Sequence, residues 1–334
     1  MAFDQHREQI AFDALDTATG EVSRGRIRPA DRLGFRRWLR RWDGEEIEAA
    51  LEATTGWRFM VEELEAVGAV VHLAEPAETS ALRGPKRRAK TDRRDARRLR
   101  ELLQAGRVPE SWIPPEHILE LRSKVRLRHT LIQGRGEWQQ RIQAQLYHHG
   151  VERRRGLLVG ERRAWLEALE LPDAARRQIE VALALIDSID AQLEPLDQEL
   201  RALARRQPGC RALMAHFGIG EITSVSILAE LGDARRFSSA RQAVRYAGMD
   251  ITVSESDRKR APGHLSRQGP PTLRWALFEA AQVARWPRSP DRDYYEQAAD
   301  RLGSNRACLS IARRLLKRAY HTLSELGEEA LQPA

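Results

Sequence analysis

The sequence predicts an α/β domain followed by a mainly α-helical remainder. Alternation of apolar and polar residues, the pattern of β-strands, dominates the chain up to Leu73. A sustained heptad repeat occupies the middle of the chain, and glycine turns separate amphipathic helical stretches beyond it. Proline and glycine interrupt these patterns at two places, which sets the domain boundaries at residues 1–107, 115–206 and 207–328.

The first domain is predicted to alternate strands and helices in a defined order. Phe12 and its alternate neighbours give residues 9–15 the period of a half-buried strand. A turn at Gly20 leads to a third strand, and a later strand ends in Glu52. The predicted strands lie at residues 1–4, 9–15, 21–27, 47–52 and 69–73, with helices at 30–42 and after Gly56. This order is typical of an RNase H-like domain, in which Asp4, Glu52 and a following helix converge on one side of the sheet.

That following helix begins inside one of the most basic segments of the chain. Thr91 is a suitable N-cap, and the apolar stripe behind it passes back through Asp95 and Asp92. Two carboxylates one turn apart and facing the protein repel each other unless a cation lies between them. Four acids, with Asp4 and Glu52, would hold Mg²⁺ for phosphodiester chemistry. The alternative is that Asp92 and Asp95 only favour the positive end of the helix dipole.

Charge indicates a polyanionic partner. The chain has 56 Lys and Arg against 48 Asp and Glu, a net charge of +8 with an isoelectric point near 10, which favours nucleic acid. The segment before the paired acids is especially basic, and it either forms a solvated linker or binds the phosphate backbone of a nucleic acid. Its predicted phosphate-binding residues are Lys86, Arg87, Arg88 and Lys90.

Composition excludes several other classes of protein. No apolar run approaches the length of a membrane span, and no charged-then-apolar leader opens the chain, so we expect a cytoplasmic, nucleoid-associated protein. Two cysteines are too few for a disulfide framework, and no Cys/His cluster has the spacing of a zinc site.

The heptad seam runs from Ile179 to Leu203 and is the pattern of a coiled coil. It predicts self-association, with packing against the preceding helix as the alternative. Pro195 falls inside the seam, so we expect either a kink or a helix end there.

The last domain contains two features suited to phosphate. Gly218 and Gly220 form a turn between two short helices, and free amides in such a turn can bind phosphate, although glycine turns between helices are common. A polar loop downstream contains three serines that are candidates for a nucleophile, Ser254, Ser256 and Ser266. Basic residues able to stabilise a phosphate under attack surround them, namely Arg258, Lys259, Arg260, Arg267 and Arg274.

With these residues in view, the chain resembles the IS110/IS1111 family of DEDD transposases, which are bridge-RNA-guided recombinases. The resemblance spans nearly the whole chain and follows the order of the family's motifs. The matching segments are Phe3-Asp4, residues 51–56 (Leu-Glu-Ala-Thr-Thr-Gly), 90–96 (Lys-Thr-Asp-Arg-Arg-Asp-Ala), 218–220, 228–232, and 263–269 with Leu273-Arg274. Only three residues precede Asp4, whereas family members usually have more, so we expect either a true start that lies upstream or a short first strand.

The resemblance implies both a site and its partners. It implies a RuvC-like first domain that binds Mg²⁺, with Mn²⁺ as an alternative ion, and a transposase domain whose nucleophile is Ser256. The family's serine is often followed by glycine, whereas Asp257 follows here, which leaves Ser254 open as the nucleophile. The implied partners are donor and target DNA, a structured guide RNA and further copies of the chain in a dimer or tetramer. The implied metal ligands are Asp4, Glu52, Asp92 and Asp95.

Three functions are consistent with the sequence. The favoured one is a transposase of an insertion sequence that cuts and rejoins DNA by serine attack on the phosphodiester. The alternative is a RuvC-like, structure-selective DNA endonuclease that uses water as the nucleophile. The third is a nucleic-acid-binding protein without catalysis.

Overall fold

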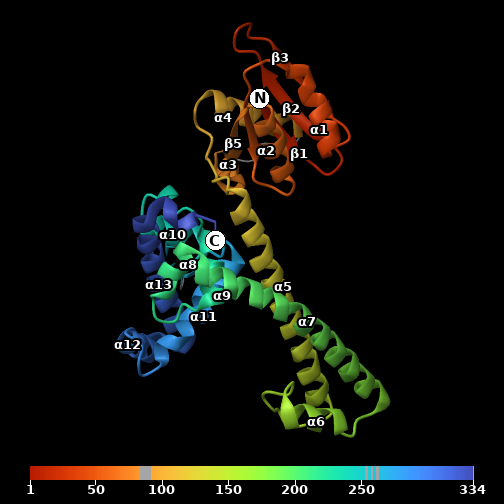
Figure 1. Cartoon of the computed structure of the whole chain (residues 1–334), viewed down its shortest axis with the longest axis vertical. Coiled ribbons are helices and arrows are strands. Elements are labelled where there is room, and N and C mark those ends of the chain that lie inside the picture. The colour runs from red at the N-terminus through yellow and green to blue at the C-terminus, as the bar shows by residue number, and fades with distance from the viewer. Residues whose placement is uncertain (83–91, 253–254, 257–258, 261–262, 334) are drawn as a thin grey trace. The chain divides into compact units, whose positions relative to one another are not determined.

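The computed structural model describes residues 1–82, 92–252, 255–256, 259–260 and 263–333. Within these residues the chain forms two compact units, Met1–Ile113 and Pro114–Ala334 (Figure 1). The predicted division of the second unit at residue 207 stays a prediction.

The first unit is built on a five-stranded mixed sheet. The strands are β1 (Ala2–Gln5), β2 (Ile10–Leu15), β3 (Val22–Ile27), β4 (Glu48–Glu52) and β5 (Val70–Ala74). Their order in the sheet is β3-β2-β1-β4-β5. Strand β2 is antiparallel to β1 and β3, whereas β4 is parallel to β1 and β5. The predicted strands, including the short first strand and the one ending in Glu52, are therefore confirmed.

Helices cover both faces of this sheet. Helix α1 (Arg32–Leu39), continued by a 3₁₀ turn at Arg40–Trp42, and helix α2 (Trp57–Ala66) share one core with Phe3 and Phe12. Helix α4 (Asp92–Gln104) packs against β1, β2 and β4. Its contact layer is made of small side chains from the strands and Leu99 from the helix. The members of this alanine layer are Ala2, Ala50, Ala74 and Leu99.

Strand β2 is buried on both faces, which differs from the predicted half-buried strand. All residues from Ile10 to Ala14 are buried, including Asp13, which is 1% exposed. The reason is helix α4, whose Arg100 is itself 7% exposed and forms an ion pair with the Asp13 carboxylate. Arg24 of β3 binds the other carboxylate oxygen at 2.6 Å. A charged residue at a core position of β2 therefore anchors the helix to the sheet.

The remainder of the first unit completes the edge beside β5. A short helix α3 (Pro76–Ala81), which was not predicted, follows β5 directly. The chain returns alongside β5 after α4, where the amide of Glu75 donates to Pro109 O at 2.8 Å and that of Ser111 donates to Leu73 O at 2.6 Å. This segment protects an edge that is open to pairing in an isolated sheet.

Two long helices dominate the first half of the second unit. Helix α5 (Glu116–His148) and helix α7 (Asp173–Arg206) run antiparallel, and α6 (Gly160–Ala168) lies between them in sequence. Ion pairs join the two long helices along their length. They are Lys124–Glu199, Arg128–Asp197 and Arg135–Asp190.

The predicted heptad seam lies on α7 and packs within the chain. Ile179, Ile186 and Leu200 are buried, and α5 packs along the same helix. Intramolecular packing, the alternative weighed for the seam, is thus what this chain shows, and self-association stays a prediction. Helix α7 continues through Pro195, so the predicted helix end is wrong, and the helix absorbs the missing amide of that residue.

The second half of this unit is a helical bundle around α9. Its members are α8 (Pro208–Met214), α9 (Glu221–Leu231), α10 (Ala240–Tyr246), α11 (Pro271–Gln282), α12 (Arg292–Leu302) and α13 (Ser304–Leu326), with 3₁₀ turns at Ala234–Arg236, Val283–Arg285 and Gly327–Leu331. Every residue from Ser224 to Leu231 is buried. Glu230 is 0% exposed, and the Arg126 guanidinium of α5 binds both of its carboxylate oxygens at 2.7 Å. Helix α12 was not predicted.

Among the helices of the described residues, none combines the length and the apolar character needed to cross a bilayer.

We predict that Arg100→Ala destabilises the first unit by about 3 kcal/mol, because the substitution leaves the Asp13 carboxylate buried with only one partner. Urea unfolding followed by circular dichroism measures the change. Arg97→Ala is the matched control, since Arg97 lies on the same helix and pairs with the exposed Glu101, a contact worth about 1 kcal/mol or less. Equal losses in the two variants would contradict the anchoring role of Arg100.

Candidate active site and nucleic-acid interface

Asp4 and Glu52 come from neighbouring parallel strands. Ala2 pairs with Ala50 and Phe3 with Leu51, so the next position along β1 is Asp4 and the next along β4 is Glu52. Because side chains alternate along a strand, both acids lie on the face of the alanine layer, the face that α4 covers. Adjacent strands lie about 4.8 Å apart. The register therefore makes these two carboxylates near neighbours at the carboxyl end of the strands.

Helix α4 brings Asp95 to the same face. Leu99 packs in the alanine layer, and Asp95 lies four residues earlier, which places it on the same side of the helix. Asp95 is half-buried. Asp92 is the first residue of the helix, and its side chain lies outside the described residues. The contact of Leu99 with Ala2 and Ala50 thus directs the Asp95 face of α4 toward the strands that contain the other two acids.

A metal centre is not complete among the described side chains. Within them, no group of three or more His, Cys, Asp or Glu residues could hold a metal ion. The described part of the acid set comprises Asp4, Glu52 and Asp95, so the four-ligand arrangement predicted from sequence is untested. The donor chemistry fits a hard divalent cation, because all four residues offer carboxylate oxygens. His6 also lies at the carboxyl end of β1, with its Nε2 atom 3.3 Å from Asp4 Oδ2.

The basic segment predicted to bind phosphate is not among the described residues. Lys86, Arg87, Arg88 and Lys90 all lie outside the described residues.

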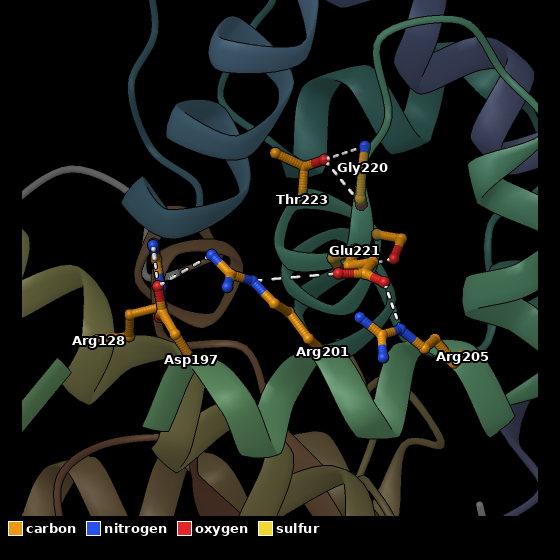
Figure 2. A network of polar contacts seen from close by, with 8 residues as sticks. Arg128, Asp197, Arg201, Arg205, Gly220, Glu221 and Thr223 are labelled. Atoms are coloured by element: carbon orange, nitrogen blue, oxygen red, sulfur yellow. Dashed lines mark hydrogen bonds and ion pairs between the residues drawn. The ribbon is translucent and has the colours of Figure 1, made fainter. Parts of the chain in front are cut away.

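The glycine turn before α9 differs from the prediction of free amides. The Gly220 amide donates to Thr223 Oγ1 at 2.8 Å, as Figure 2 shows, so it is not available to phosphate in this arrangement. Gly218 has φ +94°, and a Cβ there would lie 2.4 Å from Ala280 O, so this glycine permits close packing on α11. Phosphate binding by Gly218 and Gly220 stays a prediction.

The same helix end is occupied by a carboxylate. Glu221, the first residue of α9, accepts a hydrogen bond from Arg205 Nε at 2.6 Å and lies 4.0 Å from Arg201 Nε (Figure 2). That hydrogen bond raises the pKa of Arg205. Arg201 also approaches Asp197, the partner of Arg128, so one chain of alternating charges connects α5, α7 and α9. This network favours a structural role for the turn.

The candidate serine lies on a small β structure in a region predicted only as a polar loop. Strand β6 (Ile251–Thr252) pairs with β9 (His264–Leu265), and β7 (Glu255–Ser256) pairs with β8 (Lys259–Arg260). Ser256 lies opposite Lys259 in this second pairing. We call residues 248–269 the serine hairpin. The backbone of Ser256, Lys259 and Arg260 is described but their side chains are not, and Ser254 and Arg258 lie outside the described residues.

Two arginines hold the base of the serine hairpin. Arg313 of α13 donates from Nε to Met249 O at 2.6 Å. Arg274 of α11 donates to Ala247 O at 3.1 Å and also to Gly269 O. Burial lowers the pKa of both guanidiniums. Arg274 was predicted to bind nucleic acid, and its observed partners are backbone carbonyls, so a phosphate contact by Arg274 stays a prediction.

Close backbone contacts complete the base. A Cβ at Gly269 would lie 1.9 Å from Tyr246 O, so only glycine fits there. Ser266 donates its hydroxyl to Asp250 Oδ1, and its amide donates to Asp250 O at 3.1 Å. The hydroxyl and the amide of Ser266 therefore both bond to Asp250 at the base of the hairpin. Arg267 is exposed, with its amide bonded to Gly248 O at 3.0 Å.

Comparison with known proteins places both units in one family. A family model described as a transposase, of the DEDD type of IS110, matches residues 1–149. A second, described as the transposase IS116/IS110/IS902 family, matches residues 210–296. The first match contains the strands and helix of the candidate acids, and the second contains the serine hairpin. The chain therefore belongs to the IS110/IS1111 family of transposases.

Individual relatives agree with this assignment. The chain is 28% identical over 258 residues to "Putative transposase y4qE" of Sinorhizobium fredii, covering 74% of the chain and 62% of the relative. It is 23% identical over 238 residues to the transposase for insertion sequence element IS1111A of Coxiella burnetii, covering 67% of the chain and 64% of that protein. The chain thus spans less than two thirds of the length of these two relatives.

We predict that Arg313→Met loosens the serine hairpin, because Met249 O loses the guanidinium that binds it. Hydrogen exchange of the Ser266 and Arg267 amides, which close the hairpin base, should accelerate about tenfold, the equivalent of about 1.4 kcal/mol. Arg306→Met removes an exposed charge from the same helix and is the matched control. Equal exchange in both variants would contradict the role of Arg313 in holding the hairpin.

Proposed function

We propose that this chain is the transposase of an insertion sequence, which cuts and rejoins DNA by attack of Ser256 on a phosphodiester. Family membership over both units supports the reaction class. The observation that carries the metal assignment is the β1–β4 register, which makes Asp4 and Glu52 neighbours on the face covered by α4. The sheet order, with three antiparallel strands and two parallel ones, supports an RNase H-like, RuvC-like domain.

In the proposed reaction the Ser256 hydroxyl oxygen attacks phosphorus and loses its proton. A serine–phosphate ester forms, the bond from phosphorus to one deoxyribose oxygen breaks, and that oxygen takes up a proton. Attack by a new DNA hydroxyl reverses the step and rejoins the strands. A Mg²⁺ ion held by Asp4, Glu52, Asp92 and Asp95 would supply charge stabilisation at the phosphate. Arginine side chains near the hairpin would neutralise the developing negative charge.

The hairpin geometry supports Ser256 as the nucleophile. Its strand pairs with Lys259, and α11 and α13 fix the base of the same hairpin through Arg274 and Arg313. We propose in addition that the chain acts in the cytoplasm on nucleoid DNA, as a dimer or tetramer, with a structured guide RNA that pairs with donor and target DNA.

The nucleophile is tested by a covalent protein–DNA adduct that survives denaturation. We predict that the adduct forms with the unaltered chain and is lost, by at least about a thousandfold, in Ser256→Ala, because a covalent intermediate needs its nucleophile. Ser254→Ala is the control and keeps the adduct. DNA cleavage without any adduct would favour the alternative, a nuclease that uses water, whereas an adduct lost only in Ser254→Ala would move the nucleophile to Ser254.

The metal assignment has its own prediction. Asp95→Asn keeps the size of the side chain and removes one charged oxygen ligand, so DNA cleavage at fixed Mg²⁺ should fall at least about a hundredfold while DNA binding persists. Glu101→Gln on the exposed face of the same helix is the control. Cleavage assays across a Mg²⁺ titration measure both, and unchanged cleavage in Asp95→Asn would exclude it from the metal site.

A further inference from the structure

A pocket of about 620 Å³ opens at the same end of the sheet as the candidate acids but on the opposite face, the one that α1 and α2 cover, and the proposed reaction does not use it. Its lining comes from the end of β1, the start of β2, the segment before α1 and the start of α2. The lining residues are Gln5, His6, Arg7, Ile10, Ala30, Thr54, Thr55, Gly56 and Phe59. The volume is in the range of pockets that take small ligands.

The pocket wall is rigid where β4 turns into α2. Gln5 Nε2 donates to Thr55 O at 2.7 Å and to Thr54 O at 3.2 Å, which ties the turn to β1. Gly56 allows the turn through its φ of +96°. Gln5 Oε1 is buried and receives no hydrogen bond from the described residues.

The charge of the pocket favours an anion. His6 and Arg7 are exposed at its rim, and Arg7 has no ion pair or hydrogen bond among the described residues. Gly56 starts α2 without a side-chain cap, and the first turn of that helix has no acidic residue. The positive end of the helix dipole therefore adds to the two basic side chains.

The remaining lining suits a sugar and a base. Ile10, Ala30 and Phe59 give the pocket an apolar wall next to the hydroxyls of Thr54 and Thr55. Phosphate, sugar hydroxyls, base N–H groups and an apolar ring face are the parts of a nucleotide. A pocket lined by Arg7, His6, two threonines and apolar side chains offers a partner to each of these parts.

We propose that this pocket binds one nucleotide of a nucleic-acid strand, next to the phosphate that the acids process. His6 links the two places, because it lines the pocket and its ring nitrogen lies 3.3 Å from Asp4. The pocket holds the neighbouring nucleotide and so fixes the position of the nucleic-acid strand over the carboxyl ends of β1 and β4. This assignment rests on the proposed function for its place in the reaction, but not for binding itself.

Photo-crosslinking of the full chain tests the proposal. Short single-stranded DNA containing 4-thiothymidine and single-stranded RNA containing 4-thiouridine are irradiated with the Ser256→Ala chain, and crosslinked peptides are mapped. We expect crosslinks within residues 5–10 or 54–59. Crosslinking of DNA alone, RNA alone or both supports the pocket and identifies the strand it takes. No crosslink in either segment with either probe would overturn the proposal.

Charge-matched variants separate the pocket from general attraction to a basic chain. Arg7→Gln should lower the yield of these crosslinks about fivefold, because a charge-assisted hydrogen bond to phosphate is lost. Arg26→Gln removes an equal, exposed charge from β3 and should leave the yield unchanged. Equal loss in both variants would overturn the assignment. If the unaltered chain forms no serine adduct while the pocket crosslinks persist, the result counts against the proposed function and leaves the pocket assignment in place.

Discussion

The architecture of the first unit depends on the contact between α4 and a layer of alanines. Ala2, Ala50 and Ala74 have small side chains, so the helix approaches the strands closely and Leu99 packs directly against them. The buried pair of Asp13 and Arg100 fixes the same helix at a second point. With these two anchors the helix has little freedom to rotate, and Asp95 stays on the face that Asp4 and Glu52 share.

The serine hairpin depends on elements far from it in sequence. Its base is formed by Gly269 packed on Tyr246 O, and by guanidiniums from α11 and α13 bound to carbonyls of the hairpin. None of these contacts uses a residue near Ser256. The bundle around α9 therefore determines where the hairpin starts and ends.

The alternation of apolar and polar residues predicted where the strands lie, whereas contacts between residues distant in sequence determined how deeply their side chains are buried. Alternation and turn residues placed the strands, including the one that ends in Glu52, because strand pairing follows the period of the side chains. Burial of Asp13 was not predictable, since the helix that covers it comes 87 residues later. The contact of Thr223 with the Gly220 amide was recognisable from the sequence, because a hydroxyl three residues after a helix N-cap is a known capping pattern. The contact of Arg313 with Met249 O was not, because the two residues lie 64 positions apart.

In the proposed metal site, acids distant in sequence gather around one divalent ion at the carboxyl end of β1 and β4. Replacing Mg²⁺ by Fe²⁺ and generating hydroxyl radicals cuts a polypeptide next to the bound metal, and the ends of the fragments locate the site. If the metal binds at this site, cuts appear near residues 4, 52 and 92–95 in the same sample, and Asp4→Asn suppresses all of them. Cuts confined to one of these segments, or unaffected by that substitution, would contradict it.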